Sequence, residues 1–348
     1  MGRMKSNFRS IFLSVSAALI VLNIKAYSGG TLVNNGTLQI GNGVVNGSVS
    51  GNILNNTLLV FNPAVSNTFA AGITGPGQVL KSGPGALSLI ASNNYSGGTT
   101  VNDGVLEFAG GWLSTDIGIV QVNSGAIQIN GIISNAADTV TVTGGTLSGT
   151  GLILSAVNVQ PAGTLAFSAS IGTLTISNAL ALAGSAIMKI DRAAGQTSDK
   201  VVGLTAVTYG GVLVVTNLGG TLLAGDSFQL FSASSYAGTF SGIVPPAPGP
   251  GLAWDTNSLA VNGTLLIKVI PPPRFVSVAL NGSGNLVFQG TNGPPGVGYT
   301  VLSSTNLAVS FALWVTNTTG SFDGTGAFSN SIPVDPTILN DFFLLCVP

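Results

Sequence analysis

The stretch that decides the fold reads Ser28-Gly-Gly-Thr-Leu-Val-Asn-Asn-Gly-Thr-Leu-Gln-Ile-Gly41. It returns further along the chain as Ser96-Gly-Gly-Thr-Thr-Val-Asn-Asp-Gly-Val-Leu-Glu-Phe-Ala109, with eight of the fourteen positions identical. Within each copy, apolar residues alternate with small or polar ones, which is the period of a β-strand. A turn of Asn or Asp closed by glycine interrupts each copy, because glycine readily adopts the positive φ that such turns need. The repeat therefore predicts short strands joined by tight turns.

A looser motif, a glycine followed by apolar residues at alternate positions, recurs about every twenty residues, at Gly104, Gly125, Gly145, Gly163 and Gly184. A unit of this length cannot close a hydrophobic core alone, but stacked copies bury a continuous one. No amphipathic helical stretch of useful length follows residue 26. We therefore predict an all-β fold, with a right-handed parallel β-helix or solenoid over residues 27–268. A pair of antiparallel β-sandwiches is the alternative, since they also produce short strands at regular spacing.

The first 26 residues are organised like a secretory signal peptide. A basic segment, residues 3–9, precedes an uncharged apolar run from Ile11 to Leu22, which is too short to span a bilayer as a helix. Ala26 offers a small residue at which cleavage can occur. We predict export, with residues 1–26 removed and no membrane span left after removal. An uncleaved anchor or a buried first strand is the alternative.

Composition excludes several classes of function. The 348 residues include ten Lys and Arg, eleven Asp and Glu, one Cys and no His. Four basic residues lie in the first 25 positions, so the remainder is mildly acidic, which argues against nucleic acid as a partner. Without His the chain lacks the commonest general base and zinc ligand, and we expect no metal and no cofactor. The single Cys346 lies in an apolar run and is expected to be buried.

Prolines divide the end of the chain from the repeats. Pro271, Pro272 and Pro273 favour an extended, semi-rigid spacer, so residues 269–274 are predicted to be a linker. Beyond it, short runs with strand period continue to the end. Residues 275–348 are therefore predicted to form a small C-terminal β-sandwich-like domain.

The segment Asn94-Tyr-Ser-Gly-Gly-Thr-Thr-Val-Asn-Asp-Gly-Val-Leu106, preceded by Gly83-Pro-Gly-Ala-Leu-Ser-Leu-Ile90, resembles the autotransporter-associated β-strand repeat of bacterial surface proteins. Such repeats are typical of large exported proteins of Verrucomicrobia-like bacteria. The resemblance implies a passenger-type β-helix that is secreted or displayed on the cell surface. Residues 275–348 are too few for the membrane translocator that ends an autotransporter, so we expect the resemblance to cover the passenger architecture alone.

One densely charged stretch, residues 189–200, is the candidate for chemistry. It includes Asp191, Asp199 and Lys200, on a predicted loop between strands. It either forms a pocket like those of polysaccharide lyases and hydrolases built on β-helices, or it is a solvated loop whose ion pairs contribute little. We favour the solvated loop, since the sequence has no nucleophile elbow, phosphate loop or metal-ligand spacing. Asp103, beside Gly104, is interpreted as a turn acceptor rather than as a catalytic group. We predict no catalytic, cofactor-binding or metal-binding residue.

Trp112, Trp254 and Trp314 are of the residue type that stacks on sugar rings, but at least two of them lie in apolar strand-like surroundings, which favours core packing. We therefore predict a non-enzymatic protein, an exported or surface-displayed structural or adhesin-like passenger. Its expected partners are cell-surface or extracellular polysaccharide or other surface proteins. The alternative is a carbohydrate-binding or polysaccharide-degrading β-helix protein, whose function alone should be lost when Asp191, Asp199 and Lys200 are substituted together.

Overall fold

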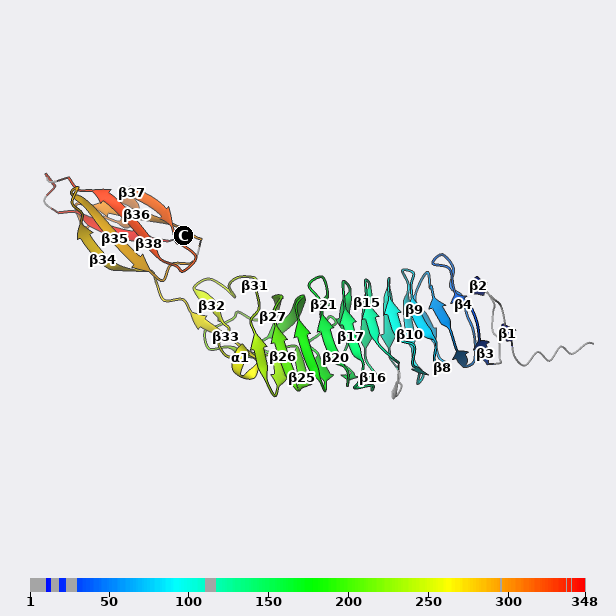
Figure 1. Cartoon of the computed structure of the whole chain (residues 1–348). Coiled ribbons are helices and arrows are strands. Elements are labelled where there is room, and N and C mark those ends of the chain that lie inside the picture. Colours follow the sequence, from blue (N-terminus) through cyan, green and yellow to red (C-terminus); the bar gives the residue numbers. More distant parts are fainter. Residues whose placement is uncertain are drawn as a thin grey trace, which may run out of the picture. The chain divides into compact units, whose positions relative to one another are not determined.

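The computed structural model describes residues 11–13, 19–22, 30–109, 117–294, 296–335, 337–338 and 340–347. The chain divides into two compact units, one comprising Met1–Pro248 with Trp254–Ile267 and the other Gly249–Ala253 with Lys268–Pro348. In Figure 1 the first is a stack of strands coloured from blue to yellow, and the second a pair of sheets in orange and red. Helix is confined, within the described residues, to α1 (Leu259–Asn262) and the 3-10 turn Phe311–Leu313. The predicted all-β class is confirmed.

The first unit is a three-sided parallel solenoid, in which each strand pairs with the strand one turn further along. The longest sheet, called here the long sheet, takes one strand from each turn in the order β2 (Leu19–Leu22), β4 (Thr37–Ile40), β6 (Leu58–Phe61), β9 (Gln78–Lys81), β12 (Thr99–Val101), β14 (Val120–Val122), β17 (Thr139–Val142), β20 (Ala156–Val159), β23 (Ala179–Leu182), β26 (Ala206–Tyr209) and β30 (Tyr236–Gly238).

The second side of the solenoid is a sheet in the order β7 (Asn67–Phe69), β10 (Ala86–Leu89), β13 (Val105–Phe108), β15 (Ala126–Ile129), β18 (Thr146–Ser148), β21 (Thr164–Leu165), β24 (Ser185–Asp191), β27 (Val212–Gly219) and β31 (Gly242–Val244). The third side is built first from β1 (Ile11–Leu13), β3 (Thr31–Val33), β5 (Ile53–Asn55), β8 (Ile73–Gly75) and β11 (Asn94–Tyr95). It continues with β16 (Ile132–Ile133), β19 (Leu152–Ile153), β22 (Thr173–Ile176), β25 (Lys200–Leu204) and β29 (Phe231–Ala233).

The chain also forms a small three-stranded sheet, whose first two strands pair antiparallel. Its strands are β28 (Ser227–Gln229), β33 (Thr264–Val269) and β32 (Leu252–Asp255), in that order. Helix α1 contacts β29 and β30, and Leu259 of α1 is buried. The predicted parallel solenoid is confirmed, and the antiparallel alternative for this region is wrong.

The core of the solenoid consists of columns of residues in register on successive turns. One inward column of the long sheet includes Ile40, Phe61, Lys81, Val101 and Val122. Apart from the lysine these side chains are apolar, and all five are buried. Strand after strand shows the burial alternation that the period of two predicts. Stacking therefore turns the repeat into one continuous apolar core.

Stacked turns explain the repeated glycine. Gly83, Gly104 and Gly125 each have a positive φ, and a Cβ on Gly104 would lie 2.6 Å from the carbonyl oxygen of Gly83. The carboxylate of Asp103 accepts a hydrogen bond from the Gly104 N–H at 2.7 Å, as Asn35 does from Gly36 at 2.9 Å. Asp103 is a turn acceptor, as predicted.

Two strands lie within the predicted leader. β1 pairs in parallel with β3, with Ile11 opposite Thr31, and β2 pairs with β4, with Leu19 opposite Thr37. The other residues of the 1–26 segment lie outside the described residues. Removal of this segment on export stays a prediction.

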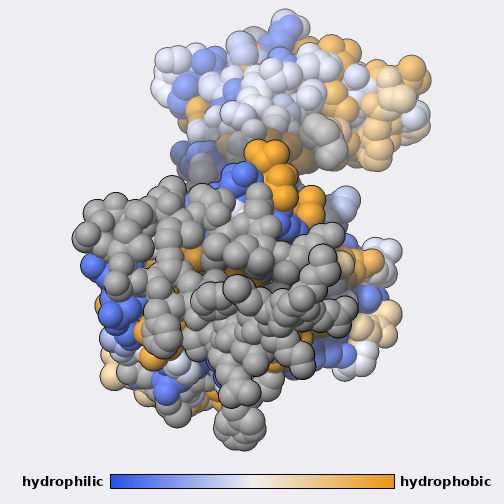
Figure 2. Space-filling model, turned by 90° about the vertical axis from the view of Figure 1, so that its right-hand side faces the viewer, coloured by the Kyte–Doolittle hydropathy of each residue, from blue (hydrophilic) through white to orange (hydrophobic). Residues whose placement is uncertain are grey.

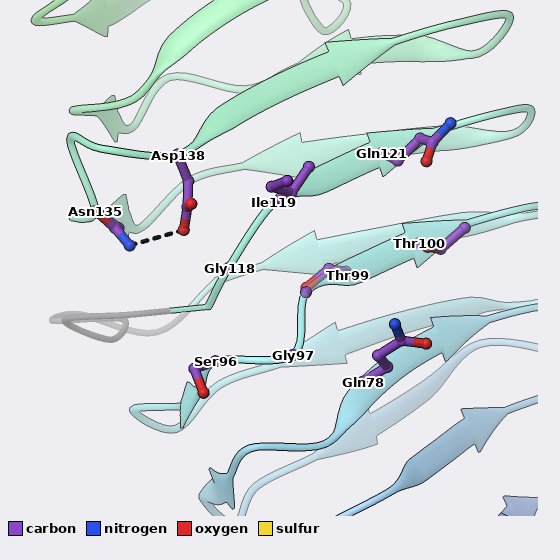
Figure 3. Close-up of a pocket in the computed structure, with 11 residues that line it drawn as sticks. Gln78, Ser96, Gly97, Thr99, Thr100, Gly118, Ile119, Gln121, Asn135 and Asp138 are labelled. Atoms are coloured by element: carbon purple, nitrogen blue, oxygen red, sulfur yellow. Dashed lines mark hydrogen bonds between the residues drawn. The ribbon is translucent and has the colours of Figure 1, made fainter.

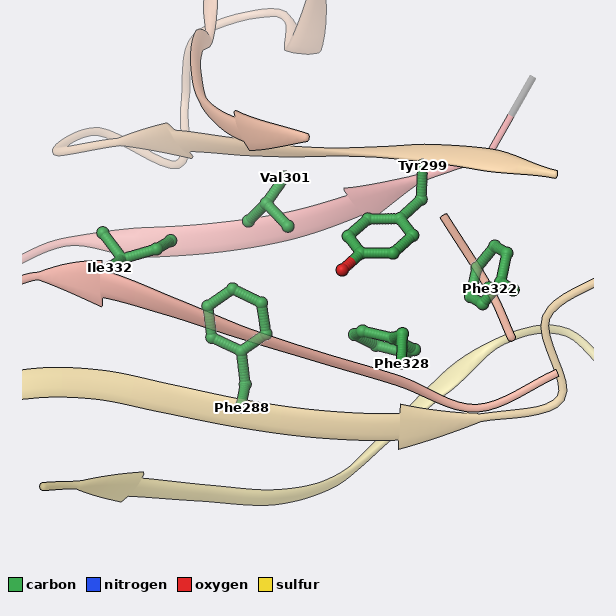
Figure 4. Packing of buried hydrophobic residues seen from close by; sticks show 6 residues of the cluster. All are labelled: Phe288, Tyr299, Val301, Phe322, Phe328 and Ile332. Carbon is green, nitrogen blue, oxygen red and sulfur yellow. The ribbon is translucent and has the colours of Figure 1, made fainter. Parts of the chain in front are cut away.

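The second unit is a small sandwich of two antiparallel sheets. One has the order β34 (Arg274–Leu280), β35 (Asn285–Thr291), β38 (Phe328–Pro333), and the other β37 (Val315–Ser321), β36 (Gly298–Ser304), β39 (Phe342–Cys346). Figure 4 shows the aromatic and aliphatic side chains between them, which are Phe288, Tyr299, Val301, Phe322, Phe328 and Ile332. The predicted C-terminal sandwich is confirmed.

Some apolar residues of the second unit lie on its surface. Val278, Leu280 and Leu313 are more than half exposed. Figure 2 displays one face of this unit, and hydrophobic residues gather on the right of that face. Cys346 is half-buried at the end of the edge strand β39, so the prediction of a buried thiol is wrong. An edge strand has a neighbour on one side only, which leaves the side chain partly open to solvent.

Candidate functional site

The charged stretch 189–200 contains a buried ion pair that holds its two ends together. The Nζ of Lys189 and the Oδ2 of Asp199 are 2.8 Å apart, and the two side chains are 9% and 0% exposed. The same carboxylate accepts hydrogen bonds from the backbone N–H groups of Lys189 and Gly172, at 2.7 and 2.8 Å. The Lys189 ammonium lies 5.5 Å from the ring centroid of Phe167. The buried Asp199 carboxylate therefore has one ionic partner and two backbone N–H partners.

These contacts correct the interpretation of the stretch as a solvated loop with loose ion pairs. Asp199 points into the protein, whereas Asp191 accepts a hydrogen bond from the Ala193 N–H at the surface, so the two carboxylates serve different contacts. The triple substitution of Asp191, Asp199 and Lys200 also loses its value as a test. Removing the buried Asp199 leaves a buried cation unpaired and damages the fold whatever the function is.

Lys81 is a buried cation that the sequence analysis did not single out. Its side chain is 0% exposed and lies in the inward column between Phe61 and Val101. Its Nζ donates hydrogen bonds to the carbonyl oxygens of Gly83 and Asp103, at 2.8 and 2.9 Å, and to that of Ser82 at 3.2 Å. Burial lowers the pKa of Lys81 to about 8, while the charge of Asp103 acts in the opposite direction.

A polar hollow opens on the outside of the long sheet. Val79, Thr99 and Val120 are paired on β9, β12 and β14. The residues one position earlier, Gln78, Gly98 and Ile119, form a column on the outward face. Because Gly98 has no side chain, the column has a gap between its two neighbours. This gap lies in the lining of a hollow of about 510 Å³. Gly98 has a φ of +94°, and a Cβ there would lie 2.9 Å from the carbonyl oxygen of Ile119, so this gap is built into the backbone.

Polar side chains border the hollow, as Figure 3 shows. Thr100 and Gln121 are in register on β12 and β14 and form the adjacent outward column. At another edge the Asp138 carboxylate accepts a hydrogen bond of 2.7 Å from the Asn135 side-chain amide. Among the described lining residues Asp138 carries the one charge, and no cation is present. The hollow therefore offers amide, hydroxyl and carboxylate groups to a ligand.

The tryptophans considered for sugar stacking are mostly engaged in contacts within the protein. Trp314 is 8% exposed, its Nε1 donates to the carbonyl of Val309, and its ring lies against that of Phe311. Trp254 is half-buried and donates to the carbonyl of Pro245 at 2.9 Å. Trp112 lies outside the described residues. For Trp314 the predicted packing role is confirmed.

The described part of the chain holds no cluster of three or more His, Cys, Asp or Glu side chains arranged to bind a metal ion. Within the same residues, no helix is both long and apolar enough to cross a membrane.

A family model described as the passenger-associated-transport-repeat matches residues 20–40 and 79–108. The second match runs from β9 to β13 and includes Gly98 and Thr100 of the hollow. The chain is also similar to a curated protein, the adhesin BmaC autotransporter of Brucella suis biovar 1 (strain 1330), with 35% identity over 100 residues. That match covers 29% of this chain and 3% of the Brucella protein, so the chain spans a small part of the length of this relative. The chain carries repeats of the autotransporter passenger type, which confirms the resemblance found in its sequence.

Proposed function

We propose that this chain, whose repeats are of the autotransporter passenger type, is an exported and surface-displayed, adhesin-like protein without catalytic activity. The observation that carries the proposal is the passenger-associated-transport-repeat, matched at residues 79–108 on the turns that border the polar hollow. The similarity to an adhesin autotransporter supports the same role. The solenoid of this chain presents columns of outward side chains that repeat from turn to turn, and such a surface is suited to many weak contacts.

The arrangement of carboxylates supports a binding role rather than hydrolysis. Glycoside hydrolysis requires two carboxyl groups facing one another across the scissile bond. The hollow has one carboxylate among its described lining residues, Asp138, and this group is bonded to Asn135. The other charged candidate, Asp199, is occupied by Lys189 and two backbone N–H groups.

Surface labelling and adhesion test the proposal. Cells that produce the full chain are treated, intact and lysed, with an antibody against the chain and with a protease. We expect labelling and cleavage on intact cells, and beads coated with the purified full chain should attach to bacterial or algal cells better than albumin-coated beads. Cleavage only after lysis would contradict surface display, and equal attachment of the two kinds of bead would contradict the adhesin-like role.

A further inference from the structure

We infer that the polar hollow on the long sheet binds a neutral polysaccharide, with the glycan chain running along the solenoid axis, across the strands. The inference rests on the proposed function, since it names the partner class of an adhesin-like rod. It is carried by four observations: polar side chains that have no hydrogen-bond partner among the described residues, the repetition of polar side chains from turn to turn, the charge of the hollow, and the pairing of the strands beneath it.

The first observation concerns hydrogen bonds. Within the described residues, the side chains of Gln78, Thr100 and Gln121 form no hydrogen bond with one another or with neighbouring groups. Amides and hydroxyls both donate and accept hydrogen bonds. Sugar hydroxyls do the same, so the three side chains and the hydroxyl groups of a glycan complement each other.

The second observation is a repeated polar column. Thr100, Gln121, Thr141 and Asn158 are in register on four successive strands of the long sheet. Neighbouring strands in a sheet lie about 4.8 Å apart, so this column presents one polar side chain at each such step. The column becomes apolar at both ends, at Leu80 before Thr100 and at Ala181 after Asn158. A polymer with hydroxyl groups along its length matches a column of this kind better than a compact ligand does.

The third observation is charge. The described lining has one carboxylate and no cation, so an acidic polysaccharide would meet repulsion and find no counter-ion. Ile119, which is 59% exposed at the edge of the hollow, offers an apolar contact for the C–H face of a sugar ring. A neutral glycan satisfies both features.

The fourth observation separates a glycan from an extended peptide. A peptide commonly binds a sheet by adding a strand to an exposed edge. Here β12 is paired on one side with β9 and on the other with β14, so its backbone has no free edge at the hollow. A ligand in the hollow therefore contacts a row of side chains and the backbone of Gly97 and Gly98.

Affinity electrophoresis of the purified full chain tests the inference, in gels that contain laminarin, xylan, mannan or, as the acidic counterpart, alginate. We expect retardation by at least one neutral polysaccharide that persists when the salt concentration is raised. The variant with Thr100→Val and Gln121→Ala should bind about tenfold more weakly, from the loss of two hydrogen-bonding groups. The matched control is Gln128→Ala, since Gln128 lies on β15 of the same turn but on the second side of the solenoid.

Each outcome decides the inference. Retardation of the parent chain and of Gln128→Ala, but not of the double variant, supports it, provided circular dichroism shows that all are folded. Gln78→Ala, on the other side of Gly98, is the second variant and should also weaken binding. No retardation by any neutral polysaccharide, equal retardation of all variants, or binding to alginate alone overturns it. If coated beads still attach to cells in these cases, the adhesin-like function stands and only the glycan assignment fails.

Discussion

Raising the pH from 7 to about 9.5 should stabilise the solenoid, and Lys81→Met should abolish this gain. The ammonium of Lys81 is 0% exposed and burial lowers its pKa from 10.5 to about 8. Between these two values the unfolded chain binds more protons than the folded chain, so the free energy of unfolding rises with pH. From pH 7 to 9.5 the shift corresponds to a gain of about 2 kcal/mol. The gain begins near pH 8 and is complete above pH 10.5.

Buried tyrosines set the upper limit of the useful pH range. Burial raises the pKa of Tyr95 and of Tyr209. Their hydroxyls therefore ionise in the unfolded chain at a pH where the folded chain keeps them protonated, and stability falls once the pH exceeds about 10. Below that pH the contribution of Lys81 is separate from theirs.

The assay is guanidinium chloride unfolding of the full chain at several pH values from 7 to 9.5, followed by far-UV circular dichroism. The parent chain should unfold at increasing denaturant concentration as the pH rises, and Lys81→Met should not. Lys268→Met, which removes an exposed lysine, serves as the control and should keep the rise. A parent chain whose stability is flat or falls over this range, or a Lys81→Met variant with an unchanged rise, would refute the reasoning.

Three further substitutions test the packing of the chain. Asp199→Asn should cost about 3 kcal/mol in calorimetry, because it leaves the buried lysine of its ion pair uncompensated; a loss below about 1 kcal/mol would show that the pair is dispensable. Gly211→Ala should cost about 2 kcal/mol or more, because a Cβ there would overlap the carbonyl of Gly184. Gly242→Ala, with open space around it, is the control and should be nearly neutral in the same unfolding assay. Phe288→Ala should destabilise the C-terminal sandwich by about 3–5 kcal/mol, and a differential scan that shows the solenoid transition also displaced would contradict separate cores.

The repeat predicted strands and turns well, but not the side of the solenoid on which they lie. The two copies of the motif begin their first strands at Thr31 and Thr99, in equivalent positions of the sequence. Thr31 lies in β3 on the third side and pairs with Ile53, whereas Thr99 lies in β12 on the long sheet and pairs with Val79. Every side uses the same apolar alternation and the same glycine turn. Local sequence therefore specifies a strand and its inward face, while the side on which the strand lies is set by its pairing with strands of neighbouring turns.

The candidate site was harder to predict because it depends on neighbours in other turns. The lining of the polar hollow includes Gly98 between the larger Gln78 and Ile119. The register of three strands sets this arrangement, and the sequence of any one strand does not show it. The sequence does indicate that Lys81 is buried. Strand residues alternate between the two faces, so Lys81 lies on the same inward face as Val79. Its three carbonyl acceptors, by contrast, belong partly to the next turn, at Asp103. A charged residue in an inward position thus indicates a buried polar contact even when its partners are unknown.

The N-terminus shows why one apolar run supports two interpretations. A signal-peptide core and a buried strand both require uncharged apolar residues, and the run from Ile11 to Leu22 satisfies both. The structure places Leu19–Leu22 in register on β4, and the repeat match begins at residue 20, before the predicted cleavage after Ala26. If export removes residues 1–26, β3 and β4 become the first turn and uncover the end of the core at Val33 and Ile40. The mass of the exported chain distinguishes a cleaved signal peptide from a buried first turn. A first residue at 27 supports the leader, whereas a mature chain that retains residues 19–22 supports a first turn formed by β1 and β2.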